Sequence, residues 1–274
     1  MSDVWDTLNI RIQTSALTDC KESWANAGRT LHNDPFNRIY WIRKGEAFIE
    51  HDGETHHLTR GDLHVIPAHS PGYYRCPDRM DLYWCHFNAT VLAEIELFDY
   101  AKCQLNCHIP KSDYARMDQF WERLVSLSKE NNPAAKFESS GILCLLLAKM
   151  LGSIDRNELE RRNSAYEKFA PVFEYVEKHM HKKVKVKELA ALVHLQENYF
   201  SNLFHKSFGL SPISYLKRQR VKRAQALLKA GDSSLKRIAE DCGFGSPFHF
   251  SLAFKELVGV PPGVFRRMDS AGGP

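Results

Sequence analysis

Apolar and polar residues alternate in short runs over the first third of the chain, from about Leu8 to Asn88. The runs end at turn-forming residues such as Lys44-Gly45, Asp52-Gly53 and Arg60-Gly61-Asp62. Asp-Gly between two such runs predicts a two-residue β-hairpin, because both central positions need positive φ. Short strands at this spacing are typical of a β-barrel or β-sandwich.

The hydrophobic period changes after Pro110. Apolar residues then recur every three or four positions on both sides of Asn131-Asn132-Pro133, which predicts an antiparallel pair of helices at 111–151. Their apolar stripe has two interpretations, a dimer interface or a cap on the barrel, because a barrel offers limited surface to cover. Residues 152–166 are polar and without a long apolar face, which is typical of a linker.

From Tyr166 onward the period is helical, with breaks at which Gly is followed by Ser or Pro. Two stretches of this region resemble one another. Each has an apolar-Ala pair, Leu189-Ala190 or Ile238-Ala239, then a turn, a second helix and a Gly-x-(Ser/Pro)-Pro stop. The repeat therefore predicts two copies of helix, tight turn, helix.

The second helix of each copy carries the chemistry. Phe204 or Phe254 anchors it inside, and in a helix-turn-helix the opposite face enters the DNA major groove. The predicted outward residues are Asn198, Ser201, Asn202 and His205 in the first copy and Phe248, Ser251 and Leu252 in the second. Asn can pair with adenine through two hydrogen bonds, whereas Phe and Leu can touch only a thymine methyl. We therefore expect the first copy to read most of the bases.

Charge supports this interpretation once it is divided along the chain. The 274 residues, enough for two domains, carry a net charge of +4. Residues 167–267 hold 18 Lys and Arg against 9 Asp and Glu, a net charge of +9, and the remainder has a net charge of −5. A basic C-terminal region favours a polyanionic partner.

Two classes of protein are disfavoured by the remaining composition. No apolar run is long enough to cross a bilayer and the N-terminus lacks a signal-like segment, so we expect a cytoplasmic protein with no membrane partner. Seven cysteines without ligand spacing favour reduced thiols over a disulfide framework.

The stretch from Leu189 through YFSNLFHKSFGLSPISYLKRQRVKRAQALL to IAEDCGFGSPFHFSLAFKELVGVPPGVFRR resembles the AraC-type regulators. The resemblance implies two helix-turn-helix units on one long linking helix, with basic side chains close to phosphates. Those basic residues are Arg218, Arg220, Lys222 and Arg223. The chain departs from the family at Gln196 and Glu197, where Ser usually starts the helix, so the first recognition helix lacks the best N-cap. It departs again at Leu252, where many relatives carry Arg.

The N-terminal half, with Gly45, Gly53, Gly61-Asp62, Ile66-Pro67 and the run YWCHF, resembles the cupin-like effector domain of many AraC-type regulators. This implies a barrel pocket for a small molecule, often a sugar, which stacks on aromatic rings and hydrogen-bonds through its hydroxyls. Strand alternation turns about half of the candidate lining residues inward. The candidates are Arg38, Tyr40, Trp41, Tyr74, Trp84 and His86.

Together these patterns predict an α+β protein of two domains. Residues 1–110 form a cupin-like β-barrel, 111–151 a helical hairpin with a possible role in dimerisation, 152–166 a linker, and 167–268 an all-α domain with two helix-turn-helix units. The predicted function is transcription regulation without enzyme activity. The expected partners are double-stranded promoter DNA, a small-molecule effector such as a sugar, a second copy of the chain and RNA polymerase, with no cofactor and no metal.

The sequence is also compatible with two other functions. One is a dimeric DNA-binding protein that takes no ligand. The other is a metal-dependent cupin enzyme, suggested by the many histidines of this half. The enzyme is disfavoured because no His-x-His pair occurs in residues 1–90 and Gly72 stands where a later histidine ligand is needed.

Overall fold

The computed structural model describes residues 4–24, 28, 31–32, 34–92, 94–231 and 233–270. The chain divides into two compact units. The barrel unit comprises Asn9–Ala89 and Glu96–Asp155, and the helical unit comprises Met1–Leu8, Thr90–Ile95 and Arg156–Pro274.

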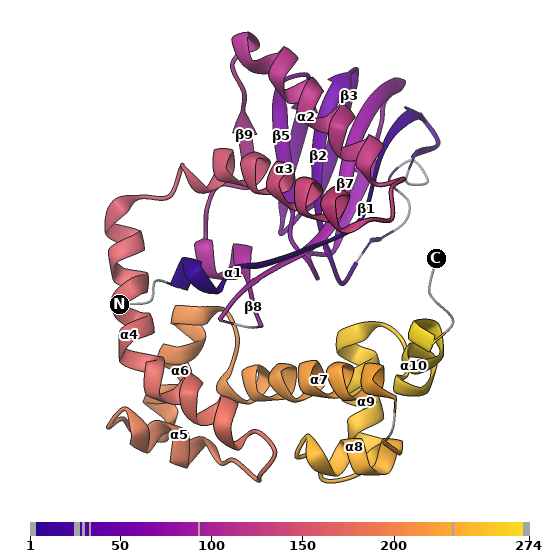
Figure 1. The fold of residues 1–274 in the computed structure, drawn as a ribbon. Coiled ribbons are helices and arrows are strands. Elements are labelled where there is room, and N and C mark those ends of the chain that lie inside the picture. Colours follow the sequence, from indigo (N-terminus) through magenta and orange to yellow (C-terminus); the bar gives the residue numbers. More distant parts are fainter. Residues whose placement is uncertain are drawn as a thin grey trace. The chain divides into compact units, whose positions relative to one another are not determined.

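The barrel unit is built on two sheets (Figure 1). The larger has the strand order β1-β7-β2-β5-β9, with β8 paired to β7, and the smaller has the order β4-β3-β6. The strands are β1 Asn9–Lys21, β2 Asn37–Lys44, β3 Glu46–His51, β4 Glu54–Thr59, β5 Asp62–Ile66, β6 Gly72–Arg75, β7 Arg79–Val91, β8 Ile95–Glu96 and β9 Asn106–His108.

The turn between β3 and β4 has the predicted chemistry. Asp52 and Gly53 have φ values of 53° and 79°, the positive values that a two-residue hairpin needs. The register that follows pairs Ile49 with His56. The side chains of two paired residues lie on the same face of the sheet. Along one strand, residues two positions apart also lie on the same face. His51 and His56 therefore lie on one face of the smaller sheet.

The core of the barrel unit contains buried residues from both sheets, among them Tyr40 and Ile42 of β2 and Ile49 of β3. Strand β2 is buried on both faces, because its alternate residues face the helical hairpin. Trp41 Nε1 donates a hydrogen bond to the Asp118 carboxylate in α2 at 2.9 Å. Two sheets around one core confirm the expected cupin-like barrel.

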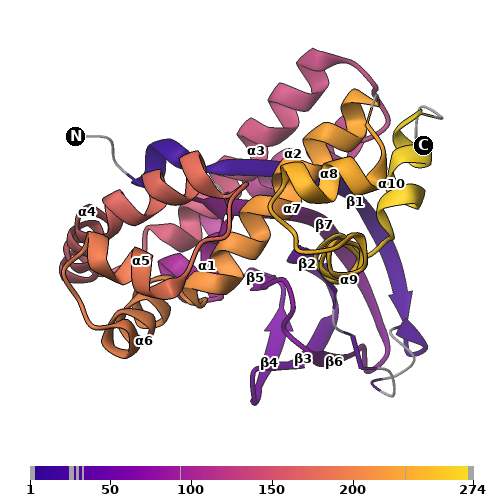
Figure 2. The same cartoon turned by 90° about the horizontal axis from the view of Figure 1, so that it is seen from below.

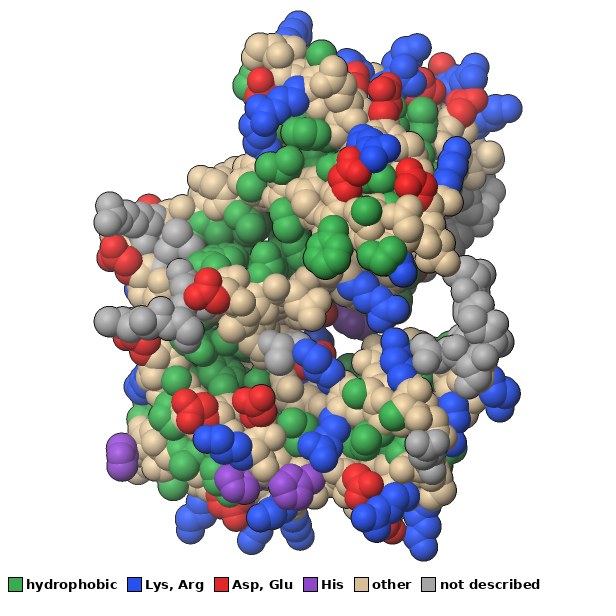
Figure 3. Space-filling view, in the orientation of Figure 1, with side chains coloured by type: hydrophobic (Ala, Val, Ile, Leu, Met, Phe, Trp, Pro, Cys, Tyr) green, Lys and Arg blue, Asp and Glu red, His purple; other side chains and the backbone are tan. Residues whose placement is uncertain are grey.

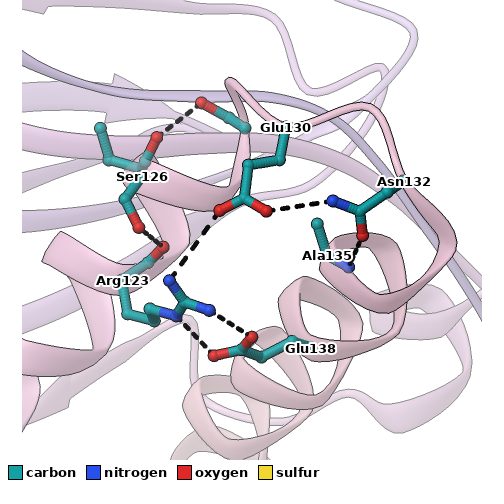
Figure 4. A network of polar contacts seen from close by, with 8 residues as sticks. Arg123, Ser126, Glu130, Asn132, Ala135 and Glu138 are labelled. Carbon is teal, nitrogen blue, oxygen red and sulfur yellow. Dashed lines mark hydrogen bonds and ion pairs between the residues drawn. The ribbon is translucent and has the colours of Figure 1, made fainter.

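The predicted helical hairpin is formed by α2, Tyr114–Leu127, and α3, Pro133–Leu151, which both pack on β1. It is preceded by the short helices α1, Leu97–Ala101, and η3, Lys111–Asp113. Figure 4 shows how polar contacts join the two long helices. Arg123 donates from Nε and Nη2 to both carboxylate oxygens of Glu138, each at 2.6 Å. Asn132 caps α3 by accepting a hydrogen bond from the Ala135 amide at 2.8 Å.

In the helical unit, α7 joins two groups of helices (Figures 1 and 2). Around one end of α7, Phe169 and Phe173 pack against Phe204, Phe208 and Tyr215 with ring centroids 5.1–5.8 Å apart. The helices are η1 Val4–Thr7, α4 Arg156–His179, α5 Val186–Leu192, α6 Glu197–Phe208, α7 Pro212–Ala230, α8 Leu235–Asp241, α9 Pro247–Val258 and α10 Pro262–Ser270.

The segment interpreted as a linker, residues 152–166, is helical from Arg156 onward, as the first part of α4. Its charged residues pair along the helix: Arg161 lies 2.9 Å from Glu158, and Arg162 contacts the same carboxylate. Such pairs at three- and four-residue spacing stabilise a polar helix without an apolar face. The linker interpretation therefore needs correction for most of this segment.

Residues 90–95, between β7 and β8, belong to the helical unit and not to the barrel unit. The Tyr215 hydroxyl donates to the Leu92 carbonyl at 3.2 Å. Burial raises the pKa of the Glu94 carboxyl, and Lys222, 3.4 Å away, partly opposes that effect. Two parts of the predicted barrel domain of residues 1–110 therefore belong to the helical unit, this short internal segment and Met1–Leu8.

Candidate DNA-binding surface and sensor pocket

The first helix-turn-helix consists of α5 and α6. Leu189 and Ala190 of α5 are buried, with relative exposures of 0% and 2%, as close packing of the two helices requires. The turn between them contains His194 in the left-handed region, with φ of 55°. Phe200, Phe204 and Phe208 form the buried face of α6.

The opposite face of α6 is open. Asn198, Asn202 and His205 are exposed and Ser201 is half-buried, so the structure brings the four predicted residues to one side of the helix. Sequence reasoning did not select Tyr199, which is 57% exposed. An aromatic residue on a DNA-facing helix can pack on thymine methyls or sugars. The position of Tyr199, between Asn198 and Phe200, is the sequence signal that could have identified it.

The second helix-turn-helix, α8 and α9, repeats this arrangement. Ile238 and Ala239 are fully buried, and Phe250 and Phe254 anchor α9. Outside, Phe248 and Leu252 are 68% and 53% exposed, and Ser251 is half-buried. The outward face of α9 is thus more apolar than that of α6, as the sequence predicted.

The two recognition helices begin differently. Gln196 occupies the N-cap of α6 and its side chain makes no capping hydrogen bond. Ser246 caps α9, where its hydroxyl accepts a hydrogen bond from the His249 amide at 3.2 Å. The prediction that the first recognition helix lacks a good N-cap is therefore confirmed.

Arg218 and Arg220, two of the four basic residues among which phosphate contacts are expected, donate hydrogen bonds to backbone carbonyls of the helical unit. Arg220 donates from Nε to Met180 at 2.8 Å and from Nη2 to Lys182 at 2.7 Å. Its guanidinium also lies 6.0 Å from the centre of the Phe244 ring. Arg218 donates to the Glu94 carbonyl at 3.4 Å. Helical spacing places both residues on α7 but does not reveal these tertiary partners.

Arg220 therefore connects the two helix-turn-helix units. Met180 and Lys182 lie in the turn between α4 and α5, whereas Phe244 lies in the turn between α8 and α9. The ion pair between Lys217 of α7 and Glu256 of α9, at 2.8 Å, joins the linking helix to the second unit. Figure 3 shows further Lys and Arg side chains along the edge of the helical unit that carries α5 and α8.

The predicted sensor residues lie together in the barrel unit. A pocket of about 410 Å³ is lined by all five of Arg38, Tyr40, Tyr74, Trp84 and His86. Trp24, His32 and Phe36 add further rings to its wall. The sixth candidate, Trp41, faces α2 on the other side of β2, because successive side chains alternate along a strand.

Arg38 is the main charged group of this pocket. Its side chain is 3% exposed and bonds to Asp34 at 2.7 Å, with its guanidinium 4.9 Å from the centre of the Tyr74 ring. Arg38 Nε and Nη2 and the Tyr74 hydroxyl are buried without a hydrogen-bond partner among the described residues. Burial, aided by Arg38, lowers the pKa of His86 to about 4. The pocket thus offers aromatic faces, several unused donors and a neutral imidazole.

A separate group of histidines was missed by sequence reasoning. His51, His56 and His64 converge, with possible ligand atoms within 4.8 Å of one another. The search for a His-x-His pair did not find them, because they come from three strands. Three ligand-type side chains from three strands therefore meet in the barrel unit, which the sequence pattern does not indicate. The seven cysteines, all in described ranges, form no disulfide.

Known proteins match both units. The model of the AraC-like ligand binding domain matches residues 22–147, and that of a helix-turn-helix domain matches residues 189–268. The uncharacterized HTH-type transcriptional regulator YisR of Bacillus subtilis (strain 168) is 30% identical over 258 residues, which cover 86% of either chain. The chain belongs to the AraC-type family of transcription regulators.

Two further relatives of this AraC-type chain match parts of it. The probable transcriptional regulator LumQ of Photobacterium leiognathi is 32% identical over 150 residues, 54% of this chain and 58% of LumQ, so less than two thirds of LumQ is spanned. The DNA-binding domain of AdpA, a global transcriptional factor crystallised with a target DNA, is 32% identical and covers 38% of this chain and 94% of its own, with a TM-score of 0.37.

Family membership and the described helices bear on one expectation each. An AraC-type regulator is not an enzyme, as the sequence predicted. Within the described ranges, no helix combines the length and the apolar character needed to span a membrane.

Proposed function

We propose that this AraC-type regulator binds double-stranded promoter DNA through α6 and α9, and that a small polyhydroxylated molecule, such as a sugar, modulates the binding from the barrel pocket. The observation that carries the proposal is the duplicated helix pair. In each copy phenylalanines hold one face of the second helix inside and leave the other face exposed. Arg220 links the two copies, so both faces can be presented to one duplex.

The test for DNA binding starts from a duplex selected out of a random pool by the full-length protein. Asn202→Ala should lower the preference for the selected duplex over competitor DNA by roughly 5- to 150-fold, the worth of one bidentate base contact. The matched control is Asn131→Ala, the same change at an exposed residue of the barrel unit. Fluorescence anisotropy over a range of salt concentrations measures both. Unchanged preference in Asn202→Ala would remove α6 from base reading.

The chemistry of the barrel pocket supports the choice of a sugar. Aromatic rings suit the C–H faces of a sugar, while the Asp34–Arg38 pair and Tyr74 can bond to its hydroxyls. A panel of mono- and disaccharides should include one that raises the thermal midpoint of the wild type. Tyr74→Phe, which removes only the buried hydroxyl, should reduce that rise, and Tyr73→Phe, one residue along β6 on the opposite face, should not. No shift with any sugar would favour the ligand-independent alternative.

We further propose that the regulator is a homodimer formed through α3. The inner face of α3 is buried against α2, β1 and β9, and part of its outer face is also apolar or small. The outer residues recur at helical spacing and are Ala134, Phe137, Gly141, Cys144, Leu145 and Ala148. Figure 3 shows hydrophobic side chains gathered over α3. An exposed apolar stripe on a helix whose opposite face is already buried is normally covered by a partner.

A further inference from the structure

Three histidines from three different strands point their rings at one another in the barrel unit. His51 ends β3, His56 lies in β4 and His64 lies in β5 of the other sheet. The Nε2 atoms of His51 and His64 are 3.1 Å apart, and the ring centroids of His56 and His64 are 4.7 Å apart. His51 and His64 are 2% and 0% exposed, and the His56 side chain is 20% exposed.

We propose that His51, His56 and His64 bind one divalent transition-metal ion of the class that includes Zn²⁺, Co²⁺ and Ni²⁺. Imidazole nitrogen is a preferred ligand for these ions. Two nitrogens at about 2.0–2.1 Å from a tetrahedral zinc lie about 3.3 Å apart, close to the observed 3.1 Å between His51 and His64. Three protein ligands leave a fourth position for water or another ligand.

The groups around the histidines are those that orient metal ligands. Asp52 Oδ2 lies 3.1 Å from His51 Nδ1 and also accepts a hydrogen bond from the Ser70 hydroxyl. A carboxylate on the far nitrogen fixes the ring of a metal-bound histidine and makes it more basic. His64 faces Asn106 in the β5–β9 ladder. His64 Nδ1 and Asn106 Oδ1 are both buried without another partner among the described residues, so Asn106 offers the acceptor that this nitrogen lacks.

Burial also keeps two of the three rings in the form that binds metal. Desolvation lowers the pKa of His56 and lowers the pKa of His64 well below its ordinary value, and the neighbouring His51 adds to both effects. Neutral imidazole is the species that coordinates a metal, so protons compete weakly at these positions.

The histidine cluster is distinct from the sensor pocket. None of its members lines the aromatic pocket around Arg38. His51 and His56 instead line a second pocket, of about 430 Å³, together with Glu54 and Cys103. Solvent and ions can therefore reach the cluster by a route that does not pass the effector residues.

The test uses the full-length chain without a polyhistidine tag. Titration with Co²⁺, followed by visible absorption, and with Zn²⁺, followed by calorimetry, should give one tight site per chain. His56→Gln should weaken binding by more than the roughly 10- to 100-fold expected for Asp52→Asn, which removes only an outer partner. Because His56 is partly exposed, this variant should keep its fold, which circular dichroism checks.

The matched control is His57→Gln, one residue along β4. His57 is 49% exposed, stacks on Phe48 and contacts Glu46, away from the cluster, so its loss should leave metal affinity unchanged. Two results would overturn the proposal: a wild type that binds no stoichiometric metal, so that the His51–His64 contact is a core hydrogen bond only, or a His56→Gln variant that binds as tightly as the wild type.

Discussion

Gly243 occupies the most crowded position of the second turn. Its φ of 76° lies in the left-handed region, and an added Cβ would press on the Met180 carbonyl oxygen, with Arg220 Nε 3.1 Å away. The equivalent position of the first turn holds His194, with φ of 55°. A residue with a side chain therefore adopts the left-handed conformation in the first turn. In the second turn the backbone of Met180 leaves no room for a Cβ at Gly243.

Gly243→Ala should therefore destabilise the helical unit. The left-handed conformation alone costs about 1–2 kcal/mol for a residue with a Cβ, and the clash with Met180 adds to it. The control is Gly245→Ala, where nothing lies within 4 Å and φ is not positive, and its effect should stay within about 0.5 kcal/mol. Urea unfolding followed by circular dichroism compares the two. Equal stability of both variants would contradict this account of the turn.

Single residues also show where sequence reasoning works. The exposure of Asn198, Asn202 and His205 could be predicted because the helical period is local and Phe204 marks the inward face of the same helix. His51, His56 and His64 have no such period, because the register of β3 on β4 and the approach of β5 bring them together. The carbonyl partners of Arg220 lie 38 and 40 residues away along the chain, so the helical spacing of α7 does not reveal them.

Among the helices and strands, α3 has an apolar face that is exposed to solvent. Phe137 is 82% exposed and Leu145 is 48% exposed, while Arg123 and Glu138 hold α3 to α2 in the arrangement of Figure 4. A helix fixed in this way presents a constant apolar stripe. Such a stripe is suited to a symmetric contact with a second copy.

Leu145→Glu should convert the proposed dimer into a monomer, because it places two charges in an apolar interface. Lys136→Glu, an exposed position of α3 off the stripe, should leave the dimer intact. Sedimentation velocity gives the mass of each variant. A wild type that is monomeric at all accessible concentrations would show that the stripe only faces solvent.

Helix α4 shows the limit of sequence reasoning for an element. Residues 152–166 lack an apolar face and were interpreted as a linker, yet the chain is helical from Arg156. The segment is part of a helix whose later residues, Phe169, Val172 and Val176, are fully buried. Packing of that later part stabilises the helix, and the ion pairs of Glu158 extend it toward its N-terminus. The polar residues 152–166 taken alone do not reveal this helix.

At the scale of the whole molecule, acid should weaken the barrel unit through its pocket histidines. Burial lowers the pKa of His86 from 6.5 to about 4 and also lowers the pKa of His32; Arg38 adds to both effects and Asp34 opposes them. In the unfolded chain both rings titrate near their ordinary value. Below that value the unfolded state binds more protons than the folded state, so stability is full above about pH 6.5 and falls as the pH drops toward 4.

The measurement is thermal unfolding of the full-length protein between about pH 7 and pH 5. The wild type should lose stability on acidification, and His86→Gln, which cannot titrate, should lose less. His205→Gln is a control, since His205 is exposed on α6. A wild type whose midpoint is unchanged or rises in acid would contradict the assignment.

The assignment of residues 90–95 to the helical unit has a practical consequence for fragments. The chain passes between the two units four times, so a protease nick near residue 155 leaves Leu92 and Glu94 of the first piece held by Tyr215 and Lys222 of the second. A fragment that begins at residue 167 lacks Leu92 and Glu94, so Tyr215 and Lys222 lose these partners. A DNA-binding fragment cloned that way will be less soluble than one supplied with the missing hexapeptide, and nicked protein will elute from a sizing column as a single species.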